Sequence, residues 1–299
     1  MRRSLIRRVV TRVHEGFRGA LDGVFAEVPE ALSGQRFVRG RCNVCGRRTR
    51  FFYPAPELFR ESLTCEHCRT TSRYRSIARG LLVAVERQAG IRAASVAGLA
   101  ALRPNRRLRV HDTQPPFRFE VCAYPLPEML RRCSWIDLSV STFKPGSQAG
   151  AVVAPGVVNE NLERLTLGDA SVDVLITSDV MEHVRLDGRA HAEIARVVRP
   201  GGCYLFTVPH FRDRHDTLVR VEVTDPDDPD RDRFLTEPEY HGDANSEDGR
   251  GALSYRSYGT ELDEQLAGLG LSVEYTKADW PAAGILNTEL FYCTRVGAA

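Results

Sequence analysis

The alternation of apolar and polar residues beyond residue 107 predicts buried strands separated by helices. Four short apolar runs have the length of strands: Leu108 to Val110, Trp135 to Val140, Val172 to Thr177 and Cys203 to Val208. Such runs are typical of strands that are covered on both faces. Helical spacing occurs between them, at 127–132 and 189–198. This order predicts a doubly wound, mostly parallel α/β sheet, whose ligand site lies beyond the carboxyl ends of its strands.

Similar patterns place further elements towards both ends of the chain. Helices are predicted at 74–88 and 261–269, and closing strands at 271–275 and 290–294. An Ala- and Gly-rich break at 89–106 separates two units, so we expect a small unit at 37–90 and a large domain at 105–299. Residues 1–36 begin with arginines among aliphatic residues, which predicts a basic amphipathic helix. Such a helix packs on the protein or a partner, or contacts anionic lipid or nucleic acid.

Composition indicates a globular protein of the reducing cytoplasm. The chain has 299 residues, 42% of them hydrophobic, and a net charge of +2. No apolar run is long enough to span a bilayer, and the first ten residues lack the apolar core and cleavage site of a secretion signal. Four scattered cysteines in mostly apolar surroundings suggest buried free thiols rather than a disulfide framework. The pattern contains no indication of the oligomeric state.

Four other cysteines form two CxxC pairs, Cys42 with Cys45 and Cys65 with Cys68. Two residues between paired thiolates allow one tight turn to direct both sulfur atoms at a single metal, and two such turns complete a tetrahedral shell. We expect a zinc ribbon with structural Zn²⁺; the alternative is a pair of knuckles without metal. His67 lies inside the second pair, where a fifth ligand is redundant.

Cations and aromatic residues are mixed around these cysteines. Three arginines at 47–50 precede Phe51, Phe52 and Tyr53, and more arginines follow the second pair. Such a surface suits nucleic acid through phosphate contacts and stacking. In the other interpretation, the aromatic residues form the small core that a zinc module needs. Both interpretations stay open at this point.

The most informative stretch runs from residue 159 to residue 209. It contains LTLGDASVDVLITSDVMEHV at 165–184 and EIARVVRPGGCYLFTVP at 193–209. These runs resemble class I S-adenosylmethionine-dependent methyltransferases of type 11, with an E-H-V turn after the fourth strand and R-V-x-x-P-G-G before the fifth. The resemblance implies a Rossmann-like sheet of seven strands, with S-adenosyl-L-methionine as the methyl donor. In this interpretation the Arg-Pro-Gly-Gly turn ends a helix and leads into the next strand.

The resemblance also implies where the cofactor is held. Residues at the carboxyl ends of the strands, and an amide and apolar pair at the adenine, are the expected contacts. The first strand departs from the family because HDTQPP at 111–116 replaces a glycine-rich turn, which makes close backbone approach harder. The expected cofactor-binding residues are Asp112, Thr113, Ser139, Asn161, Leu162, Ser178, Asp179 and Glu182.

A long insertion at about 211–251 follows the fifth predicted strand and suggests a cover over the site. Its aspartates at 225–232 lack regular ligand spacing, which favours a solvated loop over a metal site. Methyl transfer to a hydroxyl or amine needs a proton acceptor, and histidine suits this role near neutral pH. The candidate bases are His210, His241 and His183 in that order, with Asp179 as an alternative.

Two functions follow from the sequence. The first is methyl transfer to an O or N acceptor, a small molecule or glycan, with the ribbon as a stabilising or docking module. The second is a nucleic-acid-binding zinc ribbon whose methyltransferase domain is directed at RNA or is degenerate. Neither the acceptor nor a partner can be deduced from the sequence.

Overall fold

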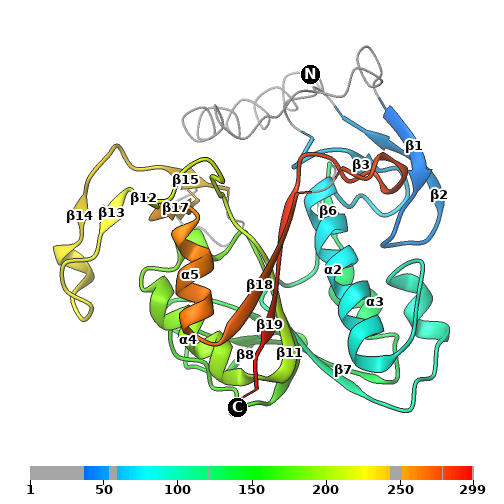
Figure 1. Cartoon of the computed structure of the whole chain (residues 1–299), viewed down its shortest axis with the longest axis horizontal. Helices are drawn as coiled ribbons and strands as arrows, with labels where there is room; N and C mark the ends of the chain where they lie inside the picture. The colour runs from blue at the N-terminus through cyan, green and yellow to red at the C-terminus, as the bar shows by residue number, and fades with distance from the viewer. Residues whose placement is uncertain (1–36, 54–58, 120, 243–250, 278, 298–299) are drawn as a thin grey trace.

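The computed structural model describes residues 37–53, 59–119, 121–242, 251–277 and 279–297. The basic helix expected at 1–36 lies outside these residues. Within them, no helix is both long and apolar enough to cross a bilayer. The structure contains a small cysteine-bearing sheet, a large mixed sheet with helices on both faces, and several two-stranded excursions (Figure 1).

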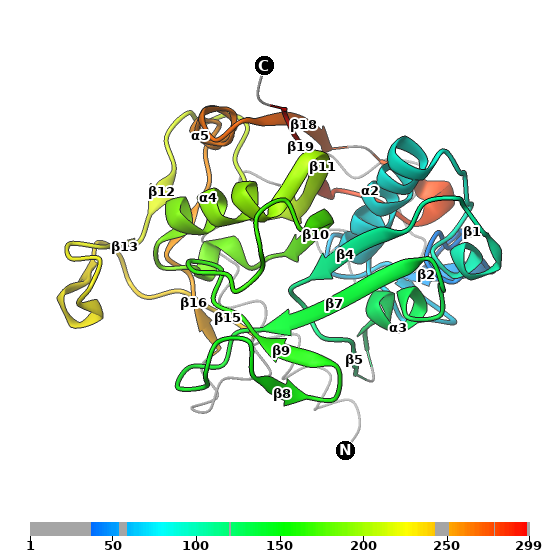
Figure 2. The same ribbon diagram turned by 90° about the horizontal axis from the view of Figure 1, so that it is seen from below.

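The large sheet has eight strands in the described residues, one more than expected. Figure 2 shows β7, β9 and β8 at one end of this sheet and β19 and β18 at the other. In spatial order the strands are β18 (Leu271–Lys277), β19 (Glu289–Arg295), β11 (Val198–Thr207), β10 (Val172–Ser178), β4 (Leu108–Asp112), β7 (Ile136–Thr142), β9 (Val157–Asn159) and β8 (Val152–Ala154). The extra strand is β8, which forms an antiparallel hairpin with β9.

The five strands β9, β7, β4, β10 and β11 run parallel, and β19 is antiparallel to β11 and β18. The chain order reverses between β4 and β10, because the connections from β4 lead to β7 and β9 on one side, whereas β10 and β11 lie on the other. In doubly wound sheets a ligand binds in the crevice at this reversal, beyond the carboxyl ends of the strands. The α/β prediction is therefore confirmed, and Asp112 and Ser178 end the two strands at the reversal.

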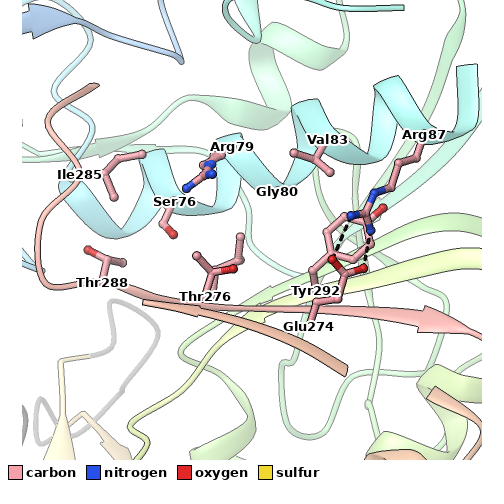
Figure 3. Close-up of a pocket in the computed structure, with 11 residues that line it drawn as sticks. Ser76, Arg79, Gly80, Val83, Arg87, Glu274, Thr276, Ile285, Thr288 and Tyr292 are labelled. Atoms are coloured by element: carbon pink, nitrogen blue, oxygen red, sulfur yellow. Dashed lines mark hydrogen bonds and ion pairs between the residues drawn. The ribbon is translucent and has the colours of Figure 1, made fainter. Parts of the chain in front are cut away.

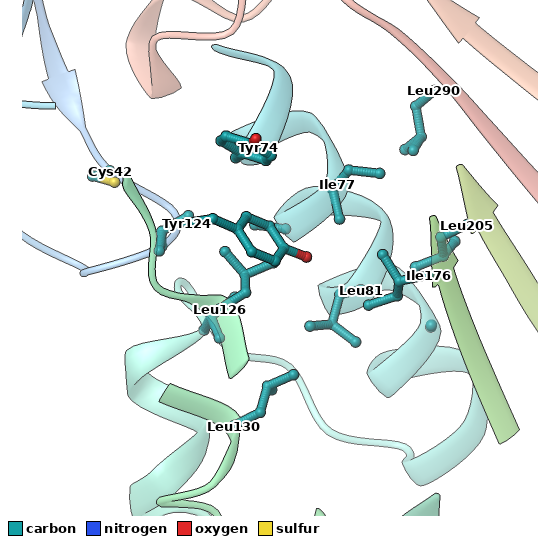
Figure 4. Close-up of a cluster of buried hydrophobic side chains, with 14 of the residues drawn as sticks. Cys42, Tyr74, Ile77, Leu81, Tyr124, Leu126, Leu130, Ile176, Leu205 and Leu290 are labelled. Atoms are coloured by element: carbon teal, nitrogen blue, oxygen red, sulfur yellow. The ribbon is translucent and has the colours of Figure 1, made fainter. Parts of the chain in front are cut away.

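Helices cover both faces of the sheet (Figure 1). The helices α2 (Ser72–Ala89) and α3 (Leu126–Leu130) lie on one face, and α4 (Asp187–Val197) and α5 (Glu261–Gly268) on the other. Successive residues of β10 alternate between the two cores, because strand side chains point to opposite faces: Ile176 packs on the α2 side and Leu175 on the α4 side. Figure 4 shows the first core, which joins α2 and α3 to β10 and β11.

The cysteine-bearing sheet consists of β1 (Phe37–Arg41), β2 (Arg48–Phe52) and β3 (Thr64–Cys65). It packs on the connection between β18 and β19, which contains the short helix η6 (Pro281–Ala283). A Cβ on Gly40 would lie 2.1 Å from the Ala282 carbonyl oxygen, and a Cβ on Gly284 would lie 2.5 Å from the Phe51 ring. The two backbones approach so closely that only glycine fits at these positions. The small sheet is thus a packed part of the molecule.

The Arg-Pro-Gly-Gly segment lies inside β11 rather than in a turn before it. Helix α4 ends at Val197, and β11 begins at the next residue. The β10–β11 register shifts between Val172 and Val174, and Gly201 has φ +72°. The expected left-handed glycine is therefore present, but it forms an irregularity in a strand that is already paired.

The remaining elements are short. The helical turns are η3 (Ala97–Ala101), η4 (Met181–His183) and η5 (Pro229–Arg231). The paired excursions are β5 (Phe117–Arg118) with β6 (Ala123–Tyr124), β12 (Leu218–Val219) with β17 (Arg256–Ser257), β13 (Val221–Glu222) with β14 (Arg233–Phe234), and β15 (Tyr240–His241) with β16 (Ala252–Leu253).

His191 of α4 gives a prediction about stability and pH. Its ring is buried against Tyr204 and Tyr258, and neither ring nitrogen has a hydrogen-bond partner among the described residues. Burial lowers the pKa of His191 to about 4. Because the unfolded chain binds this proton more readily, the free energy of unfolding falls as pH drops from about 6.5 towards 4. We expect His191→Leu to be more stable than wild type, with a larger difference at pH 5 than at pH 7.

Chemical denaturation of both proteins at the two pH values measures this difference. His215→Ala is the comparison of opposite sign, because hydrogen bonds to Asp216 and Glu264 raise the pKa of His215 and its removal should lower stability more at pH 5 than at pH 7. An equal stability difference at pH 5 and pH 7 would contradict the prediction.

Candidate functional site

Asp112 ends β4 at the sheet reversal and is fully buried. Its Oδ2 accepts a hydrogen bond from the Tyr124 hydroxyl at 2.7 Å, and its Oδ1 accepts one from the Gln114 backbone N–H at 3.1 Å. Burial raises the pKa of Asp112 to about 7, despite these bonds. Both carboxylate oxygens therefore shape the turn after β4, where the family has glycines.

Two side chains of this turn have buried polar atoms without a partner in the described structure. These atoms are Oγ1 of Thr113 and Oε1 of Gln114. The Gln114 amide nitrogen, in contrast, lies 3.3 Å from the Tyr74 hydroxyl. Buried polar atoms are rarely unpaired in a native protein, so each such atom indicates a missing partner such as a ligand or water. The turn after β4 can thus accept hydrogen bonds from a ligand at the sheet reversal.

The next expected cofactor residues lie on β7 and after β9, and they already have contacts within the protein. Ser139 lies within β7, and its hydroxyl is 2.7 Å from Nδ1 of His111. The other ring nitrogen of His111 lies 3.0 Å from the Ser141 hydroxyl, at the end of β7. Asn161 bonds its own turn, because its Oδ1 accepts from the Glu163 backbone N–H, while Leu162 is buried in the core on the α4 side. Of the two serines of β7, Ser141 lies nearer the carboxyl end of the strand.

Ser178 and Asp179 leave β10 at its carboxyl end and meet two arginines from the region beside the small sheet. The guanidinium of Arg60 donates to both oxygens of Asp179, at 2.6 and 2.7 Å. Arg73 donates to the Ser178 hydroxyl at 2.7 Å and lies 3.3 Å from Asp179. Arg60 also donates to Glu289 of β19 at 2.8 Å. We call Arg60, Arg73, Asp179 and Glu289 the edge ion cluster.

The edge ion cluster determines the protonation of Asp179. Burial alone would raise its pKa, but the charges of Arg60 and Arg73 outweigh burial and hold the pKa well below its usual range. Asp179 also accepts a hydrogen bond from the Thr207 hydroxyl at 2.8 Å. A carboxylate so strongly ionised and so fully bonded is a weak proton acceptor. Its charge nevertheless contributes to the potential at the carboxyl edge.

Glu182 follows in η4 and is completely buried, with neither carboxylate oxygen hydrogen-bonded in the described residues. Oε1 of Glu182 lies 3.7 Å from Nε2 of His183 and 3.9 Å from Nδ1 of His241. Burial and the nearby charge of Asp179 raise the pKa of Glu182 to about 8. The structure therefore brings together two of the three candidate histidines around one carboxyl group.

The third histidine, His210, lies elsewhere. It follows β11 and packs on the rings of Tyr275 and Phe291. Its Nε2 lies 3.1 Å from the Gly259 carbonyl oxygen. Burial lowers the pKa of His210 to about 4, so the ring is neutral but only weakly basic at pH 7. This environment favours His183 and His241 over His210 as the residues that act on an acceptor.

The insertion covers the loop after β10, as the sequence suggested. Strand β15 brings His241 to this loop, and the Tyr255 backbone N–H donates to the Glu182 carbonyl oxygen at 2.8 Å. Arg256 of β17 donates to the carbonyl oxygens of Val184 and Arg185. The returning end of the insertion therefore fixes the backbone around Glu182 and His183.

The aspartate-rich loop at 225–232 is filled by an arginine. Arg185 donates to both oxygens of Asp232 at 2.7 Å and to the backbone carbonyls of Asp225 and Pro226. Within the described residues, these aspartates are absent from the groups with the geometry of a metal site.

The four expected metal ligands converge in the small sheet. The Sγ atoms of Cys42 and Cys68 are 3.7 Å apart and those of Cys45 and Cys65 are 3.9 Å apart, and all four lie within 4.8 Å of one another. Four thiolates at about 2.3 Å from a tetrahedral metal are separated by about 3.8 Å. The two knuckles have the same backbone turn. In each of them the N–H of the residue after the second cysteine donates to the carbonyl oxygen of the first cysteine. The arrangement fits one tetrahedral metal.

A pocket lies between α2 and the strands β18 and β19 (Figure 3). Its lining includes Arg87 and Glu274, which form an ion pair across it. It lies against the face of the sheet, away from the β4–β10 reversal, and none of the candidate site residues lines it.

Sequence reasoning missed Arg60, Arg73 and Glu289. Arg60 and Glu289 are 229 positions apart. Nothing in the local pattern pairs them, and the high arginine content of the chain hides individual functional arginines. Only the strand order, with β19 inserted beside β11, reveals the contact.

The edge ion cluster gives a prediction about stability. The side chains of Arg60 and Glu289 are 10% and 4% exposed. Removing one partner leaves the others as uncompensated buried charges. We expect Arg60→Met to lower the free energy of unfolding by about 3–5 kcal/mol. For Arg118→Met, which breaks an ion pair of more exposed side chains with Glu128, we expect a loss below about 1 kcal/mol.

Urea denaturation of the two variants measures both losses. Equal losses would show that Arg60 contributes no more than a surface ion pair does.

Comparison with known proteins identifies the central part of the chain. Residues 123–206 match the profile of a family described as "Methyltransferase domain". A segment of 50 residues is 44% identical to a probable S-adenosylmethionine-dependent methyltransferase of Mycolicibacterium smegmatis, and covers 17% of this chain and 20% of that protein. A segment of 57 residues is 33% identical to dimethylglycine N-methyltransferase of Parasynechococcus marenigrum, covering 19% and 20%. These matches span about a fifth of the length of the curated relatives.

Solved structures give weaker similarities. An S-adenosylmethionine-dependent methyltransferase of Mesorhizobium loti is 16% identical, covering 66% of this chain and 94% of its own, with a TM-score of 0.37. The 1,6-didemethyltoxoflavin-N1-methyltransferase of Burkholderia thailandensis is also 16% identical, covering 74% and 84%, with a TM-score of 0.37. The sequence match, which spans β6 to β11, carries the assignment. Residues 123–206 are therefore similar in sequence to a methyltransferase domain.

Proposed function

We propose that the whole chain transfers a methyl group from S-adenosyl-L-methionine to an oxygen or nitrogen atom of a small molecule or glycan. The observation that carries this proposal is the turn after β4, where the buried Oγ1 of Thr113 and Oε1 of Gln114 have no partner in the described residues. Both lie at the sheet reversal, where a doubly wound fold binds its cofactor. The domain match includes the strands on either side of β4.

These residues fit the cofactor. Its amino-acid portion carries an ammonium group, which the free acceptors Thr113 Oγ1 and Gln114 Oε1 can bind beside the buried carboxyl of Asp112. In our proposal Ser141, near the end of β7, contacts the ribose. When bound, S-adenosylmethionine supplies an activated methyl group on a positively charged sulfur. The residues named here would hold it without the glycine-rich turn of the family.

The chain's own contribution to the reaction is positioning and removal of the acceptor's proton. Bound S-adenosylmethionine would give its methyl group to the acceptor atom and leave as the neutral thioether, and the acceptor's proton would pass to a polar side chain after β10. Glu182, His183 and His241 form the group of polar side chains after β10 that we assign to the acceptor side. Covered by the insertion, this group is shielded from solvent.

Part of the cationic and aromatic set around the ribbon is held inside the protein, whereas Arg47, Arg48, Arg50 and Phe52 are exposed. Arg75, one of the arginines after the second cysteine pair, is buried and donates to the backbone carbonyls of Leu63 and Gly284, and the Arg73 side chain is 12% exposed. Phe51 and Tyr53 are buried as well. Stacking and phosphate contacts need these groups at the surface. In our proposal the ribbon is structural, with Zn²⁺ held by the four cysteines.

Cofactor binding can be tested by calorimetric titration of S-adenosylmethionine into the purified, zinc-loaded protein. We expect binding in the micromolar range, weakened about 3- to 10-fold in Thr113→Val, because one hydrogen bond contributes about 0.5–1.5 kcal/mol. Thr236→Val, in the exposed part of the insertion, is the matched control. Absence of binding at millimolar cofactor would overturn the proposed function.

The structural metal gives a separate prediction. We expect elemental analysis to find one equivalent of zinc that is lost in Cys65→Ser and retained in Cys122→Ser, since Cys122 lies outside the cluster. The melting temperature should fall when the zinc is removed by a chelator, because binding free energy of a structural zinc contributes to folding. A wild-type protein reconstituted with zinc that binds none would refute the assignment.

A further inference from the structure

The group formed by Glu182, His183 and His241 contains a buried carboxylate that nothing in the described residues satisfies. Glu182 is 0% exposed, and both its oxygens lack a hydrogen-bond partner there. Its Oε1 faces one nitrogen from each imidazole, at 3.7 and 3.9 Å. Leaving a buried ionised carboxylate uncompensated costs several kcal/mol, so a compensating group is required.

The hydrogen bonds of the two histidines show which nitrogen carries the proton. Nδ1 of His183 lies 2.9 Å from the Leu253 carbonyl oxygen, which can only accept, so this nitrogen donates. Nε2 of His241 lies 2.9 Å from Oε1 of Glu239, so it donates as well. In neutral rings the nitrogens that face Glu182, Nε2 of His183 and Nδ1 of His241, therefore carry lone pairs. A carboxylate and two lone pairs directed at one another repel unless a proton or a metal cation lies between them.

The hydrogen bonds of His183 to Leu253 and of His241 to Glu239 are those expected of histidines that bind a metal through their other nitrogen. Histidine ligands of metals characteristically donate their other N–H to a carboxylate or a backbone carbonyl, which fixes the ring and its tautomer. His241 does so to Glu239, whose other oxygen is 2.7 Å from Nε of Arg220, and His183 does so to Leu253. Burial would raise the pKa of Glu239, but its bonds to His241 and Arg220 hold it below its usual value.

We propose that Glu182, His183 and His241 bind one divalent transition-metal cation, of the Zn²⁺, Fe²⁺, Co²⁺ or Mn²⁺ class. Two imidazoles and one carboxylate suit these ions better than Mg²⁺ or Ca²⁺, which prefer oxygen ligands. Ligands about 2.1 Å from a metal are roughly 3.0–3.4 Å apart. The observed 3.7 and 3.9 Å therefore require a contraction of less than 1 Å, which small side-chain rotations provide.

The position of the site connects it to the proposed methyl transfer. Three protein ligands leave coordination positions open, and the His183 and His241 side chains are 18% and 11% exposed, so the cation is reached from their side. A hydroxyl that coordinates a divalent cation loses its proton more readily. This part of the inference rests on the proposed function. The acceptor carries a hydroxyl group and a second oxygen atom close enough to chelate the same metal.

The test uses full-length protein loaded with one equivalent of Zn²⁺ per chain, which fills the four-thiolate site and leaves the proposed site open. Co²⁺ is then added, the protein is gel-filtered, and bound cobalt is counted by elemental analysis. We expect one Co²⁺ per chain, with a visible spectrum that lacks thiolate-to-cobalt charge transfer, because the ligands are nitrogen and oxygen. Glu182→Gln and His241→Ala should each lower cobalt affinity at least tenfold.

The matched control is His215→Ala. His215, Asp216 and Glu261 form the other described group with metal-site spacing outside the cysteines, but it is solvent-exposed. This variant should bind cobalt as wild type does. Thermal unfolding of each variant verifies that it is folded, and the wild-type measurement does not depend on any variant.

The proposal is overturned if wild type takes up no cobalt beyond the thiolate site, which would mean that Glu182 is neutralised by a proton alone. It is also overturned if Glu182→Gln and His241→Ala bind cobalt like wild type. Cobalt binding is measured without methyl donor, so its failure is distinguishable from failure of the proposed function, which the S-adenosylmethionine titration reports separately.

Discussion

The edge ion cluster is the interaction on which the arrangement of the molecule depends. Arg60 comes from the segment beside the small sheet, Asp179 from the end of β10, and Glu289 from the start of β19. One buried guanidinium therefore joins three parts of the chain at the carboxyl edge of the large sheet. Buried ion pairs of this kind contribute little net stability, but they cannot be broken one partner at a time. They specify one position of the small sheet over that edge.

The rest of the site is arranged around this constraint. With Asp179 held by arginines, the polar groups that remain at the edge are those of the β4 turn and of η4. The insertion then covers η4 and adds His241 to it. The result is two adjacent regions at one sheet edge: a turn suited to the amino-acid part of a cofactor, and a buried Glu–His–His group suited to an acceptor.

Much of the fold was predictable because strands buried on both faces leave a clear signal. All four strands predicted from apolar runs are present, and so are the helices α2, α4 and α5. The β8–β9 hairpin was missed, since its strands have only three residues each and β8 is largely exposed, so neither carries a distinct pattern. For the site, the spacing of the cysteines predicted their convergence, and the E-H-V turn identified Glu182 and His183. The meeting of His183 with His241 could not be predicted, because it depends on the path of an insertion without strong periodicity.

Arg60 and Glu289 also have a consequence for how the chain assembles. During synthesis, the cysteine-bearing sheet leaves the ribosome long before β19, and 229 positions separate the two partners. The same holds for Phe51, whose ring packs against Gly284. The Arg60 guanidinium and the Phe51 ring therefore lack these partners until Gly284 and Glu289 have been synthesised. Contacts of such long range are slow to form, so β18 and β19 complete the fold last, and the N-terminal unit depends on the C-terminal strands for its final shape.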